Sequence, residues 1–271
     1  MGKPDLLISK AAKLFCVVLC FVFILFNSLQ VKAQYFGQNK VRFKNLKFKV
    51  YKTPHFELYS YLKNDSTIKR FAQESELWYT LHQQVFRDTF KTPNPIILYA
   101  NHPDFQQTTA IDGDIEVGTG GVTEGLKNRV VMPVMENNHV TRHVLGHELV
   151  HAFQYHALQG SSGDFENINN IPLWMIEGMA EYLSLGKKDS YTAMWMRDAY
   201  LNKDIPSVRD LTESSKYFPY RYGEAFWSFI GSTYGDTVIV PFFKNTARYG
   251  LPYAIRRTFG YDDKTLSQLW K

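Results

Sequence analysis

The sequence of 271 residues predicts an α+β fold, in which strands dominate the first half and helices the second. Three observations predict this arrangement. Short apolar or alternating runs precede residue 134. Longer segments with helix-capping residues follow residue 138, and glycine or proline separates the segments. With 45% hydrophobic residues, the chain can bury a sizeable core, and we expect it to form two lobes.

The first 33 residues have the pattern of a secretory signal peptide. Lys3, Lys10 and Lys13 precede an apolar run over residues 14–26, and small residues around Ala33 suit cleavage before residue 34. The run is too short for a comfortable membrane span. We therefore expect a secreted or periplasmic mature chain with no stable membrane insertion. The alternative is an uncleaved segment that tethers the protein to a membrane.

Cleavage at this point would change the chemistry of the mature chain. Cys16 and Cys20 both lie in the signal, so no disulfide is expected afterwards. The segment carries four lysines and one aspartate, a net charge of +3, so the formal charge falls from +5 to +2. A charge this small gives no support for nucleic-acid binding. We expect no nucleic-acid partner.

The mature chain is expected to begin with a sheet-bearing lobe over residues 34–160. A helix is predicted from Ser66, its cap, to Arg87. Polar His102 and Asp104 are interpreted as surface loop residues. Pro133, at the end of the predicted strand over residues 129–133, suggests that this strand is an edge of the sheet, which could pair with an extended peptide. The predicted strands cover residues 41–50 (half-buried), 55–62, 96–99 (interior) and 129–133, and the predicted buried stripe of the helix is Ile68, Phe71, Leu77, Leu81 and Val85.

The remaining chain, residues 161–271, is expected to form a helical lobe. The last helix of the sheet-bearing lobe, directly before this segment, is predicted from an Asn138 cap to about residue 159, with Gly160 as its stop. The later helices are predicted over residues 172–186, 190–203, 220–234, from an Asp236 cap onwards with a kink at Pro241, and from Asp262 to the end.

The sequence His147-Glu148-Leu149-Val150-His151 has the pattern H-E-x-x-H and lies on the helix predicted from the Asn138 cap. Residues four apart share one helix face, so the two histidines can bind one metal ion. Glu148 is rotated by about 100° from His147, which places it beside a metal-bound water instead. Two imidazoles with a carboxylate suit zinc and leave a coordination position open.

A third ligand is predicted on the next helix, where Glu177 and Glu181 are four residues apart. Glu177 is assigned as the metal ligand, and Glu181 as the carboxylate that accepts the N–H of a bound histidine. The reverse assignment stays open. Gly146 and Gly178 beside these residues suggest that the two helices approach closely.

These two segments, with Trp174 and Tyr182 around the second, resemble the gluzincin branch of zinc metallopeptidases. They are similar to thermolysin-like and M1 aminopeptidase catalytic domains, and look closest to the peptidase MA domains that open secreted bacterial proteins, often ahead of a β-propeller. The resemblance is strong over residues 139–186 and looser over 41–235. It implies a zincin-like two-lobed fold, a mixed sheet and active-site helix in the N-terminal lobe, and a peptide or protein substrate.

The chain also departs from these relatives. The M1 exopeptidase motif is absent, which leaves endopeptidase activity as the expectation. M1 relatives place an oxyanion-stabilising tyrosine three residues before a glycine, and the run from Tyr220 to Gly223 matches that pattern. Tyr220 is therefore the candidate, and Tyr222 the alternative.

The expected reaction is peptide hydrolysis, with Glu148 as general base toward a zinc-activated water. Two other functions stay open. One is a catalytically silent binding module that keeps the peptidase fold. The other is a zinc hydrolase of non-peptide amides. The intact His147, Glu148, His151 and Glu177 favour an active enzyme, because a silent domain has no chemical need of Glu148.

Overall fold

The computed structural model describes residues 12–15, 17–19, 21, 40, 42–159 and 167–271. It divides into two compact units, Met1–Val41 and Arg42–Lys271. In the first unit, the described residues before position 22 are helical and fall within the predicted signal peptide. None of the described helices has the length and apolar character that crossing a bilayer requires.

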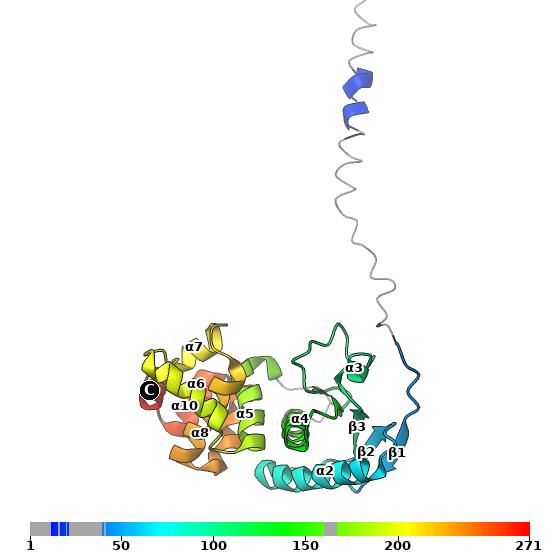
Figure 1. Ribbon diagram of the computed structural model, residues 1–271. Helices are drawn as coiled ribbons and strands as arrows, with labels where there is room; N and C mark the ends of the chain where they lie inside the picture. Colours follow the sequence, from blue (N-terminus) through cyan, green and yellow to red (C-terminus); the bar gives the residue numbers. More distant parts are fainter. Residues whose placement is uncertain (1–11, 16, 20, 22–39, 41, 160–166) are drawn as a thin grey trace, which may run out of the picture. The chain divides into compact units, whose positions relative to one another are not determined.

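The first half of the larger unit is built on a five-stranded mixed sheet with the order β1-β2-β3-β5-β4 (Figure 1). The three inner strands are parallel to one another, and each outer strand pairs antiparallel with its neighbour. Parallel neighbours need long connections, which the intervening helices supply. The strands are β1 (Lys49–Lys52), β2 (Phe56–Ser60), β3 (Asn94–Tyr99), β4 (Val122–Glu124) and β5 (Arg129–Pro133).

The two faces of the sheet bury different clusters, because side chains alternate along each strand. Leu58, Ile96 and Met132 point into the main core, which α2 (Asp65–Phe86) and α4 (Asn138–Leu158) also line. On the other face, Tyr99 and Val131 form a smaller cluster with Phe105 of α3 (His102–Phe105). The helix α4 is thus carried by a sheet that is covered on both faces.

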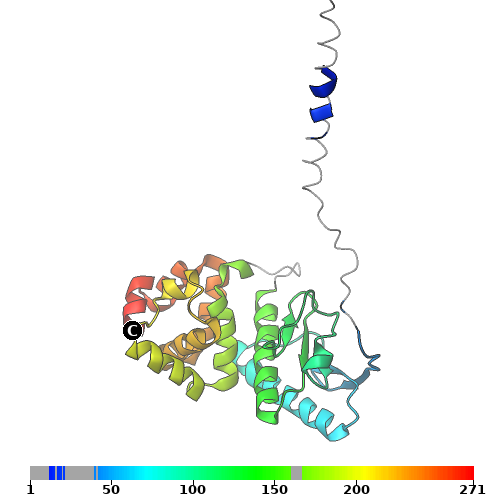
Figure 2. The same cartoon turned by 45° about the horizontal axis from the view of Figure 1, so that its top comes forward.

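The second half is helical, which confirms the predicted α+β arrangement. Helix α5 begins after Pro172 and ends at Gly186, whose φ of +90° favours glycine. Figures 1 and 2 place α4 between the sheet and α5. The elements are η1 (Ile168–Asn170), α5 (Leu173–Leu185), α6 (Ser190–Leu201), α7 (Val208–Glu213), α8 (Pro219–Tyr234), η2 (Asp236–Val238), α9 (Ile239–Tyr249), α10 (Leu251–Phe259) and α11 (Asp263–Trp270).

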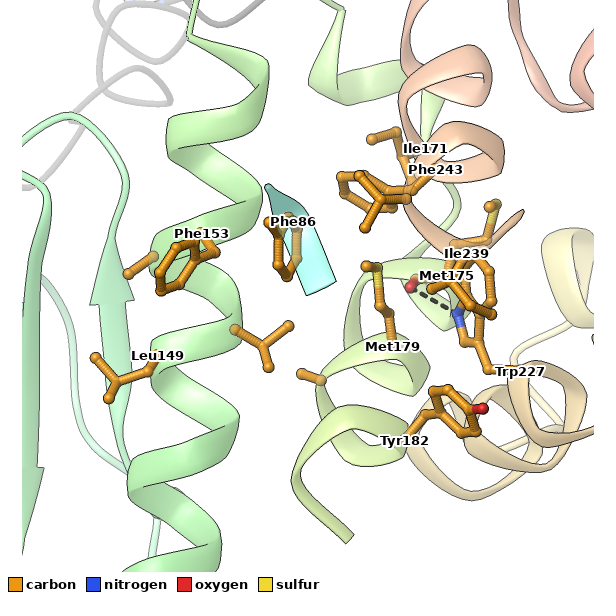
Figure 3. Packing of buried hydrophobic residues seen from close by; sticks show 14 of the residues in the cluster. Phe86, Leu149, Phe153, Ile171, Met175, Met179, Tyr182, Trp227, Ile239 and Phe243 are labelled. Carbon is orange, nitrogen blue, oxygen red and sulfur yellow. Dashed lines mark hydrogen bonds between the residues drawn. The ribbon is translucent and has the colours of Figure 1, made fainter. Parts of the chain in front are cut away.

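One hydrophobic core runs from the sheet-bearing half into the helical half. Leu149 and Phe153 of α4 lie in the same buried cluster as Met175 and Met179 of α5 (Figure 3). On the far side of α5, the buried indole of Trp227 donates a hydrogen bond to the Met175 carbonyl oxygen at 3.0 Å. The core therefore fixes α5 between α4 and α8.

Gly146 and Gly178 each allow a close approach to a neighbouring helix, but neither serves the predicted approach between α4 and α5. A Cβ at Gly178 would lie 2.3 Å from the carbonyl carbon of Gly223, so this glycine permits contact between α5 and α8. A Cβ at Gly146 would lie 2.6 Å from the indole ring of Trp78 on α2. The prediction that both glycines serve the contact between α4 and α5 is wrong.

The predicted strand over residues 41–50 is largely wrong; Val41 itself lies outside the described residues. Only β1, from Lys49, forms a ladder, and all four of its residues are exposed. The backbone N–H groups of Phe43 and Lys44 instead donate to the side-chain oxygen of Gln107, at 2.7 and 3.1 Å. A side chain thus takes the hydrogen bonds that a neighbouring strand would have accepted.

The predicted buried stripe of α2 is also wrong in most positions. Leu77, Leu81 and Val85 are exposed, whereas Trp78, Tyr79 and other residues one position along are buried. The aromatic side chains reach the sheet and α4, and their larger apolar area determines which face turns inward. The cap is Asn64, which accepts from the Ser66 and Thr67 N–H groups, and α4 likewise begins one residue early, at an Asn137 cap.

Three further predictions differ from the structure: the edge strand of the sheet, the exposure of Asp104 and the role of Asp236. Strand β5 is an inner strand, and the edge before α4 is β4, which was not predicted. Asp104 is buried, where Lys44 and Tyr61 bond to its carboxylate at 2.8 and 2.7 Å, so it is not a surface loop residue. Asp236 does not cap its helix but accepts from the Tyr182 hydroxyl at 2.7 Å. Gly160, the predicted stop of α4, lies outside the described residues.

Candidate metal centre and active site

Helix α4 brings the two histidines of the H-E-x-x-H motif together. His147 Nε2 and His151 Nε2 are 3.0 Å apart, and both side chains are largely buried. Residues four apart stack along one helix face, which accounts for the convergence of their ring nitrogens. Two adjacent imidazole nitrogens directed at one point are a basis for metal binding.

Glu177 of α5 completes a triangle with the two histidines. Its Oε2 atom lies 3.2 Å from His147 Nε2 and 3.3 Å from His151 Nε2. A tetrahedral ion with ligand bonds of about 2.0–2.1 Å holds its ligand atoms about 3.3 Å apart. The donor set of two nitrogens and one oxygen, and the spacing of these atoms, therefore fit such an ion. The structure brings these three predicted ligands together.

Glu148 lies beside this triangle and is held from the sheet edge. The hydroxyl of Thr123 on β4 is 2.7 Å from Glu148 Oε2 and 2.9 Å from the Glu148 carbonyl oxygen, and it can donate its proton to either. A Cβ at Gly121 would lie 2.8 Å from Glu148 Cγ, so only glycine leaves room there. The carboxylate is thus fixed at the end of β4, with 5% of the residue exposed.

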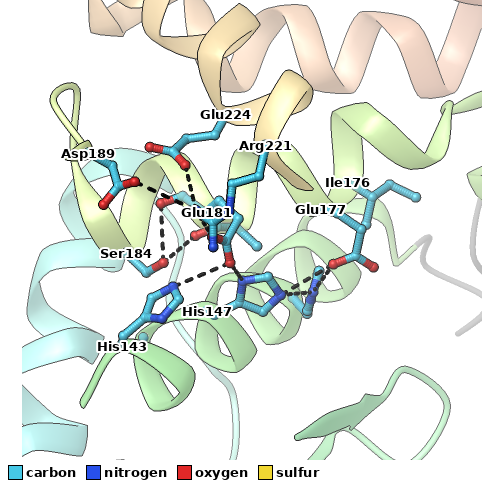
Figure 4. Close-up of polar contacts among 12 residues, drawn as sticks. His143, His147, Ile176, Glu177, Glu181, Ser184, Asp189, Arg221 and Glu224 are labelled. Carbon is cyan, nitrogen blue, oxygen red and sulfur yellow. Dashed lines mark hydrogen bonds and ion pairs between the residues drawn. The ribbon is translucent and has the colours of Figure 1, made fainter. Parts of the chain in front are cut away.

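Glu181 lies one helical turn after Glu177 and faces the other nitrogen of His147. Its Oε1 atom is 2.8 Å from His147 Nδ1 and 3.3 Å from His143 Nε2 (Figure 4). Its Oε2 atom is 2.9 Å from Arg221 Nη1 of α8. Glu177 thus faces both histidines of the motif, whereas Glu181 faces the other ring nitrogen of His147 together with His143.

Arg221 extends this network away from the triangle. The same Nη1 atom is 3.1 Å from Glu224 Oε2 (Figure 4). The Thr192 hydroxyl also donates a hydrogen bond to that oxygen. Glu224 is 1% exposed, and its burial raises the pKa to about 7, although the Thr192 hydrogen bond opposes the shift. The Arg221 guanidinium therefore links Glu181, which faces His147, to the buried carboxyl group of Glu224.

The charges around His147 attract a cation. Burial alone would lower the pKa of His147, but Glu177 and Glu181 raise it to about 10. Burial raises the pKa of Glu177, but the imidazoles of His147 and His151 outweigh that effect and hold it well below its usual range. The same balance, with His143 and His147 as partners, lowers the pKa of Glu181. Positive charge at this point, as a proton or as a metal ion, is therefore stabilised.

The two candidate tyrosines lie in different places. The Tyr220 ring stacks on the His147 ring, with centroids 5.8 Å apart, and burial together with the Glu177 carboxylate raises the pKa of its hydroxyl. Tyr222 is buried against Tyr217 and Trp195 instead. Of the two, Tyr220 is the one that the structure brings to the site.

Sequence reasoning missed Thr123, Gln154 and Arg221. Gln154 follows His151 by three residues, which is a helix-face spacing that could have identified it. Thr123 and Arg221 are brought in by β4 and α8, and no spacing in the sequence connects them to the motif. They could be found only from the folded chain.

Comparison with known families gives one match. Residues 108–209 match the BSP family, described as peptidase of plants and bacteria. This segment is well under half of the chain. It contains His147, Glu148, His151, Glu177 and Glu181, but neither Arg221 nor Tyr220. No curated protein matched the chain. The family match supports a peptidase-like domain in this part of the chain.

Proposed function

We propose that this protein is a zinc-dependent peptidase of the gluzincin type, with a zincin-like two-lobed fold and a cleft across α4. One observation carries the proposal. His147, His151 and Glu177 converge within 3.0–3.3 Å of one another, and Glu148 lies on the same helix with its carboxylate fixed at the sheet edge. The peptidase family match over the same residues supports it.

His147, His151 and Glu177 would hold the ion. A bound zinc ion would supply Lewis acidity, lowering the pKa of a water and polarising the carbonyl of the substrate. The three protein ligands leave a coordination position for the reacting groups. The carboxylate of Glu181 would keep the Nδ1 proton of His147 in place, so that Nε2 presents its lone pair.

Glu148 would act as the general base. Its carboxylate takes a proton from the attacking water and delivers it to the leaving amine. Thr123 holds one carboxylate oxygen and leaves the other available for this transfer. Tyr220, on the His147 side of the triangle, would donate its hydroxyl proton in a hydrogen bond to the oxyanion, because the raised pKa keeps that proton on the phenol.

The substrate would bind as an extended peptide. The edge strand β4 begins one residue after Gly121, beside Glu148, and among the described residues it is paired only with β5. Main-chain hydrogen bonds to such an edge recognise any extended backbone. This geometry favours endopeptidase activity, and a non-peptide amide is the alternative substrate. The predicted signal peptide would place the enzyme in the periplasm or outside the cell.

The test combines metal content with activity. We expect the purified protein to bind one zinc ion and to cleave denatured casein. Glu148→Gln should reduce kcat by about 10²–10⁴-fold while zinc content is unchanged, since the amide cannot accept the water proton. Glu136→Gln, an exposed glutamate outside the site, is the matched control and should behave as wild type.

Four results separate the alternatives. Casein cleavage that survives Glu148→Gln would refute the mechanism. Failure to take up zinc would refute the metal site. A zinc-loaded wild-type protein that cleaves no peptide but hydrolyses small amides would identify the non-peptide hydrolase, and one that hydrolyses neither would identify the silent binding module.

A further inference from the structure

Gln154 connects the two helices that carry the metal ligands. It is 3% exposed and lies three residues after His151 on α4. Its Oε1 atom is 2.8 Å from His151 Nδ1. Its Nε2 atom donates a hydrogen bond, at 3.0 Å, to the carbonyl oxygen of Ile176 on α5. Ile176 directly precedes Glu177, so one side chain contacts a ligand and the backbone beside another.

The chemistry of these contacts determines where the proton of His151 lies. A main-chain carbonyl can only accept a hydrogen bond, so the amide must direct its NH₂ group at Ile176. The amide oxygen then faces His151 Nδ1, and this oxygen also only accepts. His151 Nδ1 must therefore carry a hydrogen, and Nε2 is the ring nitrogen left for a metal ion. His151 Nε2 lies 3.0 Å from His147 Nε2 and 3.3 Å from Glu177 Oε2.

We propose that Gln154 is the positioning residue of the metal centre, which fixes the tautomer of His151 and holds α5 so that Glu177 meets the two histidines. This inference rests on the proposed zinc site. Gln154 does not touch the reacting groups and acts only through His151 and the Ile176 carbonyl. Its loss should therefore weaken metal binding as well as catalysis.

The two histidines have different partners at Nδ1. The carboxylate of Glu181 faces His147 Nδ1, whereas a neutral amide faces His151 Nδ1. A carboxylate at position 154 could still accept from His151. It could not donate to the Ile176 carbonyl, and its charge would be close to that oxygen. Only an amide serves both contacts, which explains glutamine at this position.

Two substitutions separate the two contacts. Gln154→Met preserves the length of the side chain and removes both hydrogen bonds, so zinc affinity should fall by about 10–100-fold. Gln154→Glu keeps the acceptor for His151 and loses the link to α5, so its zinc affinity should lie between those of wild type and Gln154→Met. Gln73→Met, at an exposed glutamine of α2, is the matched control and should leave affinity unchanged. Affinity is measured by competition with a chelator of known strength.

A second measurement needs no metal. Nitrogen-15 chemical shifts of the imidazoles in the zinc-free protein report which nitrogen of each histidine carries hydrogen. We expect His151 to carry it on Nδ1 in wild type and in Gln154→Glu, and to populate both tautomers in Gln154→Met. Near-UV circular dichroism verifies that each variant is folded. If Gln154→Met does not fold, Gln154→Glu and the wild-type spectrum still test the proposal.

The outcomes distinguish this inference from the proposed function. Equal zinc affinities of wild type and Gln154→Met, or a wild-type His151 without hydrogen on Nδ1, would overturn the role of Gln154 even if the enzyme is an active peptidase. Conversely, activity that survives Glu148→Gln would refute the mechanism and leave the role of Gln154 intact.

Discussion

Helix α5 is held in different ways on its two sides. Toward α8 the contact is close and largely apolar: Gly178 meets Gly223, and Trp227 fills the space beside Met175. Toward α4 an apolar core contact is joined by a polar edge, in which the two histidines and Gln154 face Glu177, Glu181 and the Ile176 carbonyl. The first contact depends on shape, and the second depends also on charge.

This difference shows how the fold divides the work between stability and chemistry. Dense packing at Gly178, Gly223 and Trp227 fixes α5 to the helical half whether or not a cation is present, and the Arg221–Glu181 ion pair joins this side to the polar edge. The polar edge brings carboxylates and imidazoles together, and its free energy depends on the charge at their centre. Substitutions on the α8 side should therefore lower the stability of the fold, whereas those on the α4 side should lower metal affinity.

The largest effect is expected from Gly223→Ala, on the packed side. The new Cβ would lie 2.3 Å from the Trp174 carbonyl oxygen and 2.8 Å from the Gly178 Cα. Backbone must move on both helices, so we expect the free energy of unfolding to fall by about 3 kcal/mol, at the upper end for overpacking. Urea denaturation measures it.

The control for that substitution is Gly118→Ala, where no atom lies within 4 Å of the new Cβ. Its stability should remain within about 0.5 kcal/mol of wild type, as for most surface changes. A Gly223→Ala protein as stable as the control would show that α5 and α8 are not closely packed.

Glu224 on α8 should make stability depend on pH by a comparable amount. Burial raises its pKa from 4.5 to about 7, with Asp189 and Glu181 adding to the shift and Arg221 and the Thr192 hydroxyl opposing it. The folded state then binds the proton more tightly than the unfolded chain. Its stabilising contribution is complete below pH 4.5 and is lost as pH rises through 7, a change of about 3 kcal/mol.

The measurement compares wild type with Glu224→Gln, which cannot titrate. Between pH 4.5 and 7, the unfolding free energy of wild type should fall relative to that of the variant. Parallel pH profiles of the two proteins would mean that Glu224 is ionised throughout, with Arg221 compensating its burial.

The smallest of the three effects is expected from Glu181→Gln, on the polar edge. The amide keeps an acceptor for His147 Nδ1 but removes the charge that faces His143 and Arg221. Zinc affinity should fall by about 10–100-fold, with a smaller change in stability than Gly223→Ala causes. Isothermal titration with zinc measures it, and Glu213→Gln, at an exposed glutamate on α7, is the control. A loss of stability without a loss of affinity would contradict the division between the two sides.

The sequence predicted those features that depend on local spacing. The α+β order, the bounds of α5 and the relation of Glu177 to Glu181 follow from helix periodicity and from stop residues such as Gly186. The pairs His147/His151 and Glu177/Glu181 are four residues apart, so each pair shares a helix face wherever the helix lies. This spacing does not decide which of the two carboxylates faces both histidines, and in the structure Glu177 Oε2 lies there.

The predictions that were wrong concern features that depend on contacts between distant segments of the chain. The buried face of α2 is decided by Trp78 and Tyr79 against the sheet and α4, which helix periodicity alone does not specify. The alternation over residues 41–50 suggested a strand, but Gln107 provides its hydrogen-bond acceptor instead. Thr123 reaches Glu148 because three residues form the unpredicted strand β4.

Under the proposed function, the position of β4 has a consequence for which proteins could be degraded. A chain that pairs with this edge must present main-chain N–H and C=O groups that are not already bonded within its own helices or sheets. Compact, natively folded proteins offer few such segments, whereas damaged, denatured or newly translocated chains offer many. A peptidase that binds its substrate along β4 would therefore leave folded proteins intact and degrade those that have lost their structure.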